Sequence, residues 1–203
     1  MHLHETKPLV TFRVVSTHIE PAPNWDRLFE FAVGQDGHFT TKDAALAGYS
    51  PQLLLKYLKN GRIIRVRRGV YRIVHFPASE HEDLATLWLW SEKKGVFSHE
   101  TALMLHNLSD ALPRKVNLTL PTSWAKRRLR VPKGVLVHHE DLPRKDRVEI
   151  GAVPVTNVRR TLIDCADAHV SPELIEAALQ QGRARGLIDK DDVKAIRARG
   201  RAA

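Results

Sequence analysis

Residues 40–73 read TTKDAALAGYSPQLLLKYLKNGRIIRVRRGVYRI, and this stretch predicts a helix, a turn, a second helix and two short strands. The hydroxyl of Thr41 can cap the first helix, and Gly48 suits its end because glycine tolerates the left-handed conformation found there. Ser50-Pro51 has the order expected at the start of a second helix, which Gly61 ends. The spacing therefore predicts a helix-turn-helix.

Residues 62–67 and 70–73 have a different period, because β-branched and aromatic residues alternate with arginines as in half-buried strands. The connection at Arg67-Arg68-Gly69 is short enough only for a tight hairpin, and Gly69 permits the positive φ that such turns need. A helix-turn-helix followed by a basic hairpin predicts a winged helix. Its second helix would enter the major groove of DNA, and its hairpin would lie on the backbone or in the minor groove.

Every charged side chain between Lys56 and Arg72 is positive, which favours a polyanionic partner. Leu54, Tyr57 and Leu58 are expected to face inward, leaving Ser50, Gln52 and Lys56 to read base edges. The hairpin arginines are expected on phosphates. The alternative is a small helix-hairpin domain with an ordinary solvated basic face. The predicted DNA-contacting residues are Thr41, Ser50, Gln52, Lys56, Lys59, Arg62, Arg65, Arg67, Arg68 and Arg72.

The segment from Gly37 to Ile73 resembles the N-terminal winged helix of AbiEi-type antitoxins, which are transcriptional regulators of type IV (abortive infection) toxin-antitoxin systems. The matching features are GHFT at 37–40, an alanine-rich helix ending in Gly48, and GRIIRVRRGVY at 61–71. A weaker similarity continues through residues 98–110 and 155–167. The resemblance implies a protein that represses its own operon and neutralises a nucleotidyltransferase-like toxin through its C-terminal region.

Composition sets broad limits on the class of protein. The 203 residues carry a formal net charge of +9 and a single cysteine, Cys165, which excludes an intramolecular disulfide. No apolar run approaches the ~20 residues of a membrane span, and the first residues lack the order of a signal peptide. We expect a soluble cytoplasmic protein that needs no cofactor or metal and binds no membrane.

The predicted fold class is α+β, with an N-terminal tail or strand (1–23), a winged helix-turn-helix (24–78) and a C-terminal antitoxin-type domain (79–203). Alternating hydrophobic runs near 116–120, 135–139 and 148–155 predict a small antiparallel sheet flanked by helices. A second basic patch follows the first of these strands and is expected to meet DNA, RNA or an acidic toxin surface. It comprises Lys126, Arg127, Arg128, Arg130 and Lys133.

The leading hypothesis is a non-enzymatic autorepressor and antitoxin, but two alternatives remain. One is a nucleic-acid-processing enzyme, suggested by His138-His139-Glu140-Asp141 and by Asp83 with Glu92-Lys93-Lys94, which loosely matches a nuclease magnesium motif. The other is a plain winged-helix regulator without a toxin. Since winged helices often bind inverted repeats, we expect a monomer in solution or a dimer on its own promoter.

Overall fold

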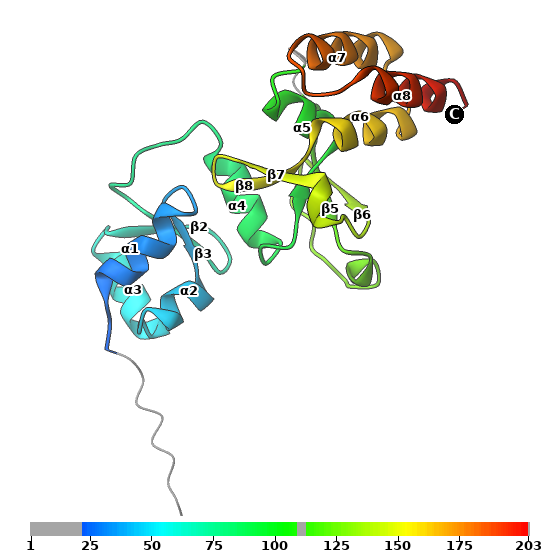
Figure 1. Cartoon of the computed structure of the whole chain (residues 1–203). Helices are drawn as coiled ribbons and strands as arrows, with labels where there is room; N and C mark the ends of the chain where they lie inside the picture. Colours follow the sequence, from blue (N-terminus) through cyan, green and yellow to red (C-terminus); the bar gives the residue numbers. More distant parts are fainter. Residues whose placement is uncertain (1–21, 109–112, 203) are drawn as a thin grey trace, which may run out of the picture.

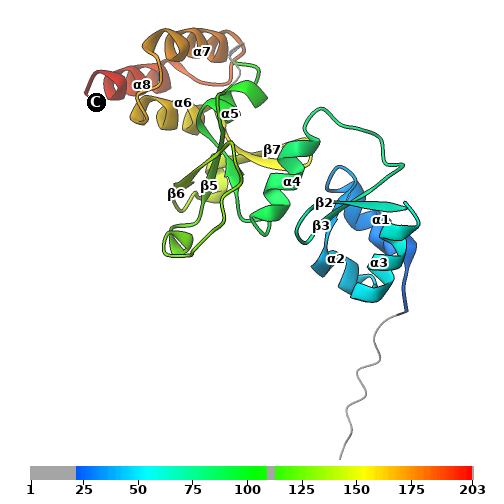
Figure 2. The same ribbon diagram turned by 180° about the vertical axis from the view of Figure 1, so that it is seen from behind.

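The computed structural model describes residues 22–108 and 113–202. Figures 1 and 2 show an elongated chain with a helix-and-hairpin unit at one end, a larger sheet in the middle and helices at the other end. The α+β fold class is confirmed. The expected tail or strand before Asn24 lies almost wholly outside the described residues.

The first unit is a winged helix-turn-helix with three helices packed on an antiparallel sheet of order β1-β3-β2. A buried core that includes Leu28, Phe39, Leu54 and Ile63 joins the helices to the sheet. Its elements are α1 (Trp25–Val33), β1 (His38–Thr40), α2 (Thr41–Leu46), α3 (Pro51–Lys59), β2 (Ile63–Arg67) and β3 (Val70–Ile73).

Local capping explains where these helices begin. Ser50 caps α3, with Pro51 as its first residue, as the sequence predicts. The expected Thr41 cap of α2 is wrong, because Thr40 occupies that position. Thr40 Oγ1 accepts from the Asp43 amide at 3.1 Å, and Asp43 Oδ2 accepts from the Thr40 amide at 2.8 Å. This reciprocal capping box satisfies two amides, whereas a threonine cap alone would satisfy only that of Asp43.

The rest of the chain forms a second sheet of order β6-β5-β4-β8-β7 with helices around it. The predicted strands near 116–120, 135–139 and 148–155 are confirmed. The sheet is mixed and not wholly antiparallel, because β5 pairs with β6 and β4 with β8 in parallel. Its strands are β4 (Val96–Phe97), β5 (Val116–Leu120), β6 (Val135–His139), β7 (Arg147–Ile150) and β8 (Val153–Thr156).

The central strand β4 has only two residues, too few for an alternating pattern, and the sequence does not reveal it. Two 3₁₀ turns, η1 (Thr122–Trp124) and η2 (Arg144–Asp146), lie in the loops after β5 and β6. The helices are α4 (Glu82–Trp90), α5 (His99–Leu105), α6 (Val158–Asp167), α7 (Pro172–Ala184) and α8 (Lys190–Ala202).

Helix α4 joins the two sheets. It packs against all three strands of the winged helix and also contacts β8, and Figures 1 and 2 show it between the two sheets. The last helices, α6 to α8, enclose a separate core that includes Leu162, Leu179 and Ile196. No helix in the described ranges combines the length and apolar character needed to cross a membrane.

Candidate nucleic-acid interface

The outward face of α3 carries the polar side chains that the helical spacing places there. Gln52, Lys56 and Lys59 are exposed, whereas Leu54 on the opposite side is 3% exposed. Leu55 is 57% exposed, so Leu54 is the leucine of residues 53–55 that faces the core most directly. Figures 1 and 2 show α3 at the end of the molecule away from the second sheet, which leaves its outer face accessible.

Apart from Arg72, positive charge on α3 and on the wing, defined as β2, β3 and the turn between them, is not neutralised. Within 22–108 and 113–202, these cations form no ion pair with a carboxylate: Lys56, Lys59, Arg62, Arg65, Arg67 and Arg68. By contrast, Arg160 and Arg197 farther along the chain are paired. Unpaired cations are the groups that bind phosphates and release their counterions.

Three of the four wing arginines, Arg65, Arg67 and Arg68, do not form one patch. Arg65 lies opposite Tyr71 and Arg67 lies opposite Val70, and consecutive strand residues such as Val70 and Tyr71 point to opposite faces. Arg65 is therefore on the face of the helices and is exposed, whereas Arg67 faces α4 and is half-buried. Arg68 is exposed in the turn itself. Arg65 and Arg68 are the wing side chains best placed to meet phosphate.

Arg62 lies away from the wing turn. Its guanidinium carbon is 5.1 Å from the ring centre of Trp25 and 5.3 Å from that of Tyr57. These two rings are stacked on each other, with centres 5.7 Å apart. Cation–π contacts hold Arg62 beside α1 and the inner side of α3. The exposed charge of Arg62 thus borders the α3 face.

Arg72 is not available as a phosphate contact, which corrects its place among the predicted residues. Its guanidinium donates to the carbonyl oxygens of Phe76 at 3.0 Å and Pro77 at 3.3 Å, and lies 3.1 Å from a carboxylate oxygen of Glu82. The Arg72 side chain is 12% exposed. It fastens the segment between β3 and α4 to the sheet.

Two predicted hydroxyl contacts are already engaged within the protein. Ser50 Oγ accepts from the Leu53 amide at 3.3 Å as the cap of α3, although it can still donate a hydrogen. The Thr41 hydroxyl donates to the carbonyl of Gly69 at 3.4 Å, and the Thr41 amide donates to the same oxygen at 3.0 Å. Thr41 therefore supports the wing turn, and Gln52 and Lys56 are the freest base-reading side chains on α3.

The second basic patch lies on the loop between β5 and β6, after η1. All five of its cations are exposed, and the structure gives them no carboxylate partner within the described ranges. Arg127 lies over the ring of the buried Trp124, 4.0 Å from its centre. The patch is thus a second exposed basic surface, on a different sheet from the wing.

A polar cleft of about 650 Å³ contains the histidines considered for catalysis. His99 from α5 also lines this cleft, and it stacks on His138 with ring centres 3.8 Å apart. Burial lowers the pKa of His99 to about 4 and also lowers that of His138, so both rings are neutral at pH 7. One nitrogen of each ring already has a hydrogen-bond partner: His99 Nδ1 bonds Ser98 Oγ and His138 Nε2 bonds Asn117 Oδ1, both at 2.9 Å.

The nuclease-like spacing does not form a site either. Asp83 is in the first turn of α4, and Glu92 lies beyond the end of that helix. The two residues are therefore about 13 Å apart along the helix axis. Lys93 binds Asp43 instead of either acid. Across the described ranges, no three His, Cys, Asp or Glu side chains are grouped closely enough to hold a metal ion.

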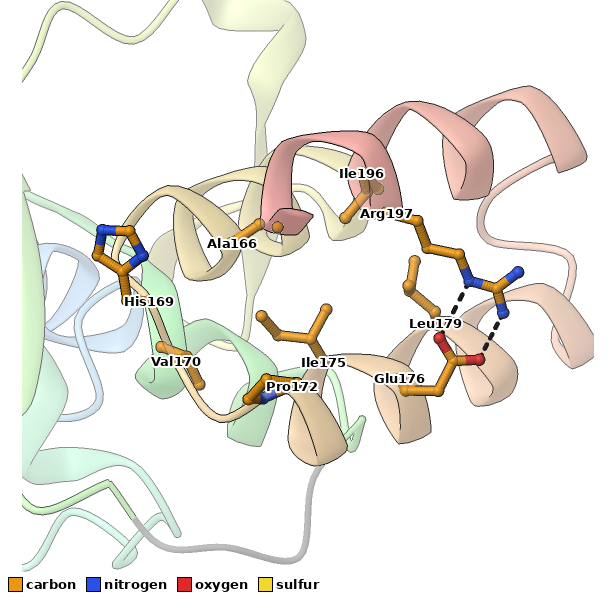
Figure 3. A pocket seen from close by; sticks show the side chains of 10 residues that line it. Ala166, His169, Val170, Pro172, Ile175, Glu176, Leu179, Ile196 and Arg197 are labelled. Atoms are coloured by element: carbon orange, nitrogen blue, oxygen red, sulfur yellow. Dashed lines mark hydrogen bonds and ion pairs between the residues drawn. The ribbon is translucent and has the colours of Figure 1, made fainter. Parts of the chain in front are cut away.

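An apolar groove of about 450 Å³ lies among α6, α7 and α8 (Figure 3). Ile175, Leu179 and Ile196 line it, and the ion pair between Glu176 and Arg197 closes one side. The groove is remote from the wing and carries none of the predicted site residues. It is a packing feature of the C-terminal helices.

Among the comparisons with known proteins, the family match is confined to the winged helix, whereas a structural alignment spans most of the chain. No curated protein gives a significant match. The crystal structure of the RV2827C protein from Mycobacterium tuberculosis aligns with a TM-score of 0.45 and 13% identity, covering 86% of this chain and 80% of that chain. A score of this size does not establish a common fold. The resemblance inferred from residues 37–73 is confirmed for the winged helix, since residues 26–74 match the model of the family described as "Transcriptional regulator, AbiEi antitoxin".

Proposed function

We propose that this protein is a DNA-binding transcriptional autorepressor and the antitoxin of a type IV toxin-antitoxin pair. The observation that carries the proposal is a winged helix of a regulator family whose α3 and wing present exposed cations without carboxylate partners. Such a surface suits the phosphate backbone, and an accessible helix beside it suits the major groove.

The residues divide into base readers and phosphate contacts. Gln52 can bond an adenine edge through two hydrogen bonds, and Lys56 can donate to a guanine edge. Lys59, Arg65 and Arg68 contact phosphates, which position the protein without reading sequence. The winged helix spans residues 24–78 in this proposal. Two copies on an inverted repeat would place two α3 helices in successive major grooves.

The antitoxin role rests on the family match, and the partner is a nucleotidyltransferase-like toxin encoded beside the gene. We assign this role to residues 79–203, whose second basic patch is a surface for an acidic or nucleic-acid partner. A co-expression assay tests it: the chain should restore growth to cells that express the neighbouring toxin. If the chain binds DNA but does not restore growth, the protein is a plain winged-helix regulator without a toxin.

Footprinting on the upstream region of the gene tests the DNA-binding role. The full chain should protect a site containing an inverted repeat, and Gln52→Ala should reduce the preference for that site over unrelated DNA. Lys190→Ala is the matched control, because it removes a positive charge from the exposed start of α8, far along the chain from the wing. No protection at any upstream position would overturn the proposal.

A further inference from the structure

A contact between α2 and the loop that follows α4 links the winged helix to the second sheet. Lys93 Nζ lies 3.0 Å from Asp43 Oδ1, although the residues are 50 positions apart. The Asp43 side chain is 6% exposed. Burial acts to raise the pKa of Asp43, but hydrogen bonds from Thr40 and Lys93 outweigh it and the pKa is lowered. The contact is therefore an ion pair with a largely buried carboxylate.

The same carboxylate holds the start of α2 beside the wing. Asp43 Oδ2 accepts from the Thr40 amide and hydroxyl, both at 2.8 Å. Thr40 pairs with Val70 across the sheet, and the next amide, that of Thr41, donates to the Gly69 carbonyl at 3.0 Å. An unbroken chain of hydrogen bonds and strand pairing thus runs from Lys93 to the wing turn.

The loop that carries Lys93 is held rigidly by the second sheet. Glu92 and Lys93 both have left-handed backbones, with φ of 54° and 62°, and Ser91 Oγ accepts from the Gly95 amide at 2.9 Å. A Cβ on Gly95 would lie 2.7 Å from Leu118 Cδ1, so the chain passes tightly against β5 before entering β4. Residues 92 and 93 keep such backbones only if their surroundings impose them.

Side-chain packing does not hold the wing turn against this loop. A cavity of about 580 Å³ lies between them, lined by Arg68, Gly69, Trp90 and Lys93 among others. Leu46 borders the cavity and is 55% exposed. The nearby pair of Lys42 with Glu92 is solvent-exposed at 3.8 Å and contributes little. The polar path through Asp43 is the main restraint at this point.

We propose that Lys93 is a positioning residue for DNA binding: without touching DNA, it holds the wing turn in place relative to α3 through Asp43. The DNA affinity of the winged helix then depends on the state of the second sheet. This inference rests on the proposed DNA-binding function. It also gives the C-terminal part a physical route by which a bound partner changes repression.

Lys93→Met and Lys94→Met in the full chain test the proposal by fluorescence anisotropy on the upstream duplex. Lys94 is the matched control, because it is the exposed neighbour and has no carboxylate partner within the described ranges. Lys93→Met should weaken binding about fivefold, the low end of typical coupling between sites. The salt dependence of binding should stay unchanged, Lys93→Arg should restore affinity, and Lys94→Met should bind as the wild type does.

A double-mutant cycle with Asp43→Asn, which keeps an oxygen acceptor for Thr40, separates positioning from direct contact. In that background Lys93→Met should have no further effect. A salt slope reduced by about 0.9 in Lys93→Met would reveal a direct phosphate contact and overturn the proposal. Wild-type affinity in Lys93→Met would overturn it too. If Lys93→Met does not fold, as judged by thermal unfolding, Lys93→Gln takes its place.

Amide hydrogen exchange without DNA provides a readout that is independent of the proposed function. Exchange in residues 67–70 should be faster in Lys93→Met than in the wild type or in Lys94→Met. If the wild type bound no duplex, the proposed function would fail, while faster exchange would still establish Lys93 as the residue that positions the wing. If exchange in residues 67–70 is the same in Lys93→Met as in the wild type, Lys93 does not position the wing.

Discussion

Replacing both Arg65 and Arg68 by alanine should weaken binding to every duplex and reduce its salt dependence. Both side chains are exposed at the wing and lack a carboxylate partner in the described part of the chain. Arg67 differs, because it faces α4, is half-buried, and has a buried Nε without a hydrogen-bond partner in the described residues. Arg67→Ala alone should therefore leave the salt dependence unchanged.

The size of the effect follows from counterion release. Each phosphate contact contributes about 0.9 to the slope of log K against log salt, so two contacts account for about 1.8. At about 0.1 M salt the same two contacts correspond to a loss of affinity of about 60-fold. The loss should be the same on the upstream site and on an unrelated duplex, since phosphates carry no base sequence.

Fluorescence anisotropy titrations from about 50 to 200 mM salt measure both the slope and its change. The matched control is Lys190→Ala with Lys194→Ala on α8, which removes two exposed positive charges at a distance along the chain. This control should keep the wild-type slope. An unchanged slope in the Arg65 and Arg68 double variant, or a full loss in Arg67→Ala alone, would refute the assignment of faces in the wing.

Three further predictions concern stability. Leu54→Ala should lower the free energy of unfolding by about 2–5 kcal/mol, whereas Leu55→Ala should change it by less than about 0.5 kcal/mol, as measured by urea denaturation. Arg72→Met should lower the free energy of unfolding by about 1–3 kcal/mol, because Glu82 and three carbonyls lose their donor. The salt slope of DNA binding should stay that of the wild type. The pKa of His99 is about 4 in the folded chain against 6.5 unfolded, so the unfolded state binds more protons between these values. Stability should fall as pH drops from 6.5 to 4, by on the order of 3 kcal/mol from this group. His99→Asn, which suits the left-handed backbone with φ of 51°, should reduce that fall in denaturation curves at pH 7 and pH 4.5.

Local signals were sufficient to predict the winged helix. Ser50-Pro51 and Gly61 mark the ends of α3, and the alternation in residues 62–73 marks a hairpin, because caps, turns and strand period depend on neighbouring residues. The same signals misplaced the cap of α2 by one residue, since Thr40 and Thr41 are both suitable caps. Only the side chain three residues later, Asp43, discriminates between them.

The mixed sheet was harder to predict, because parallel pairing between β5 and β6 and the two-residue strand β4 depend on segments that are distant in sequence. The neighbours of the candidate catalytic residues were hard to predict for the same reason. His138 was considered with its neighbour His139, but its stacking partner is His99, which comes from α5.

For the proposed DNA-binding face, the order of residues along the chain was enough to predict a basic winged helix. A run of charges of one sign and a short-range pattern are both properties of contiguous sequence. Contacts between distant residues settled which cations remain free. Arg72 is engaged by Glu82 and three carbonyls, and strand register places Arg67 on the face toward α4. Asp43 binds Lys93 from the loop after α4. These outcomes arise from folding, because ion pairing and burial depend on which surfaces the fold brings together.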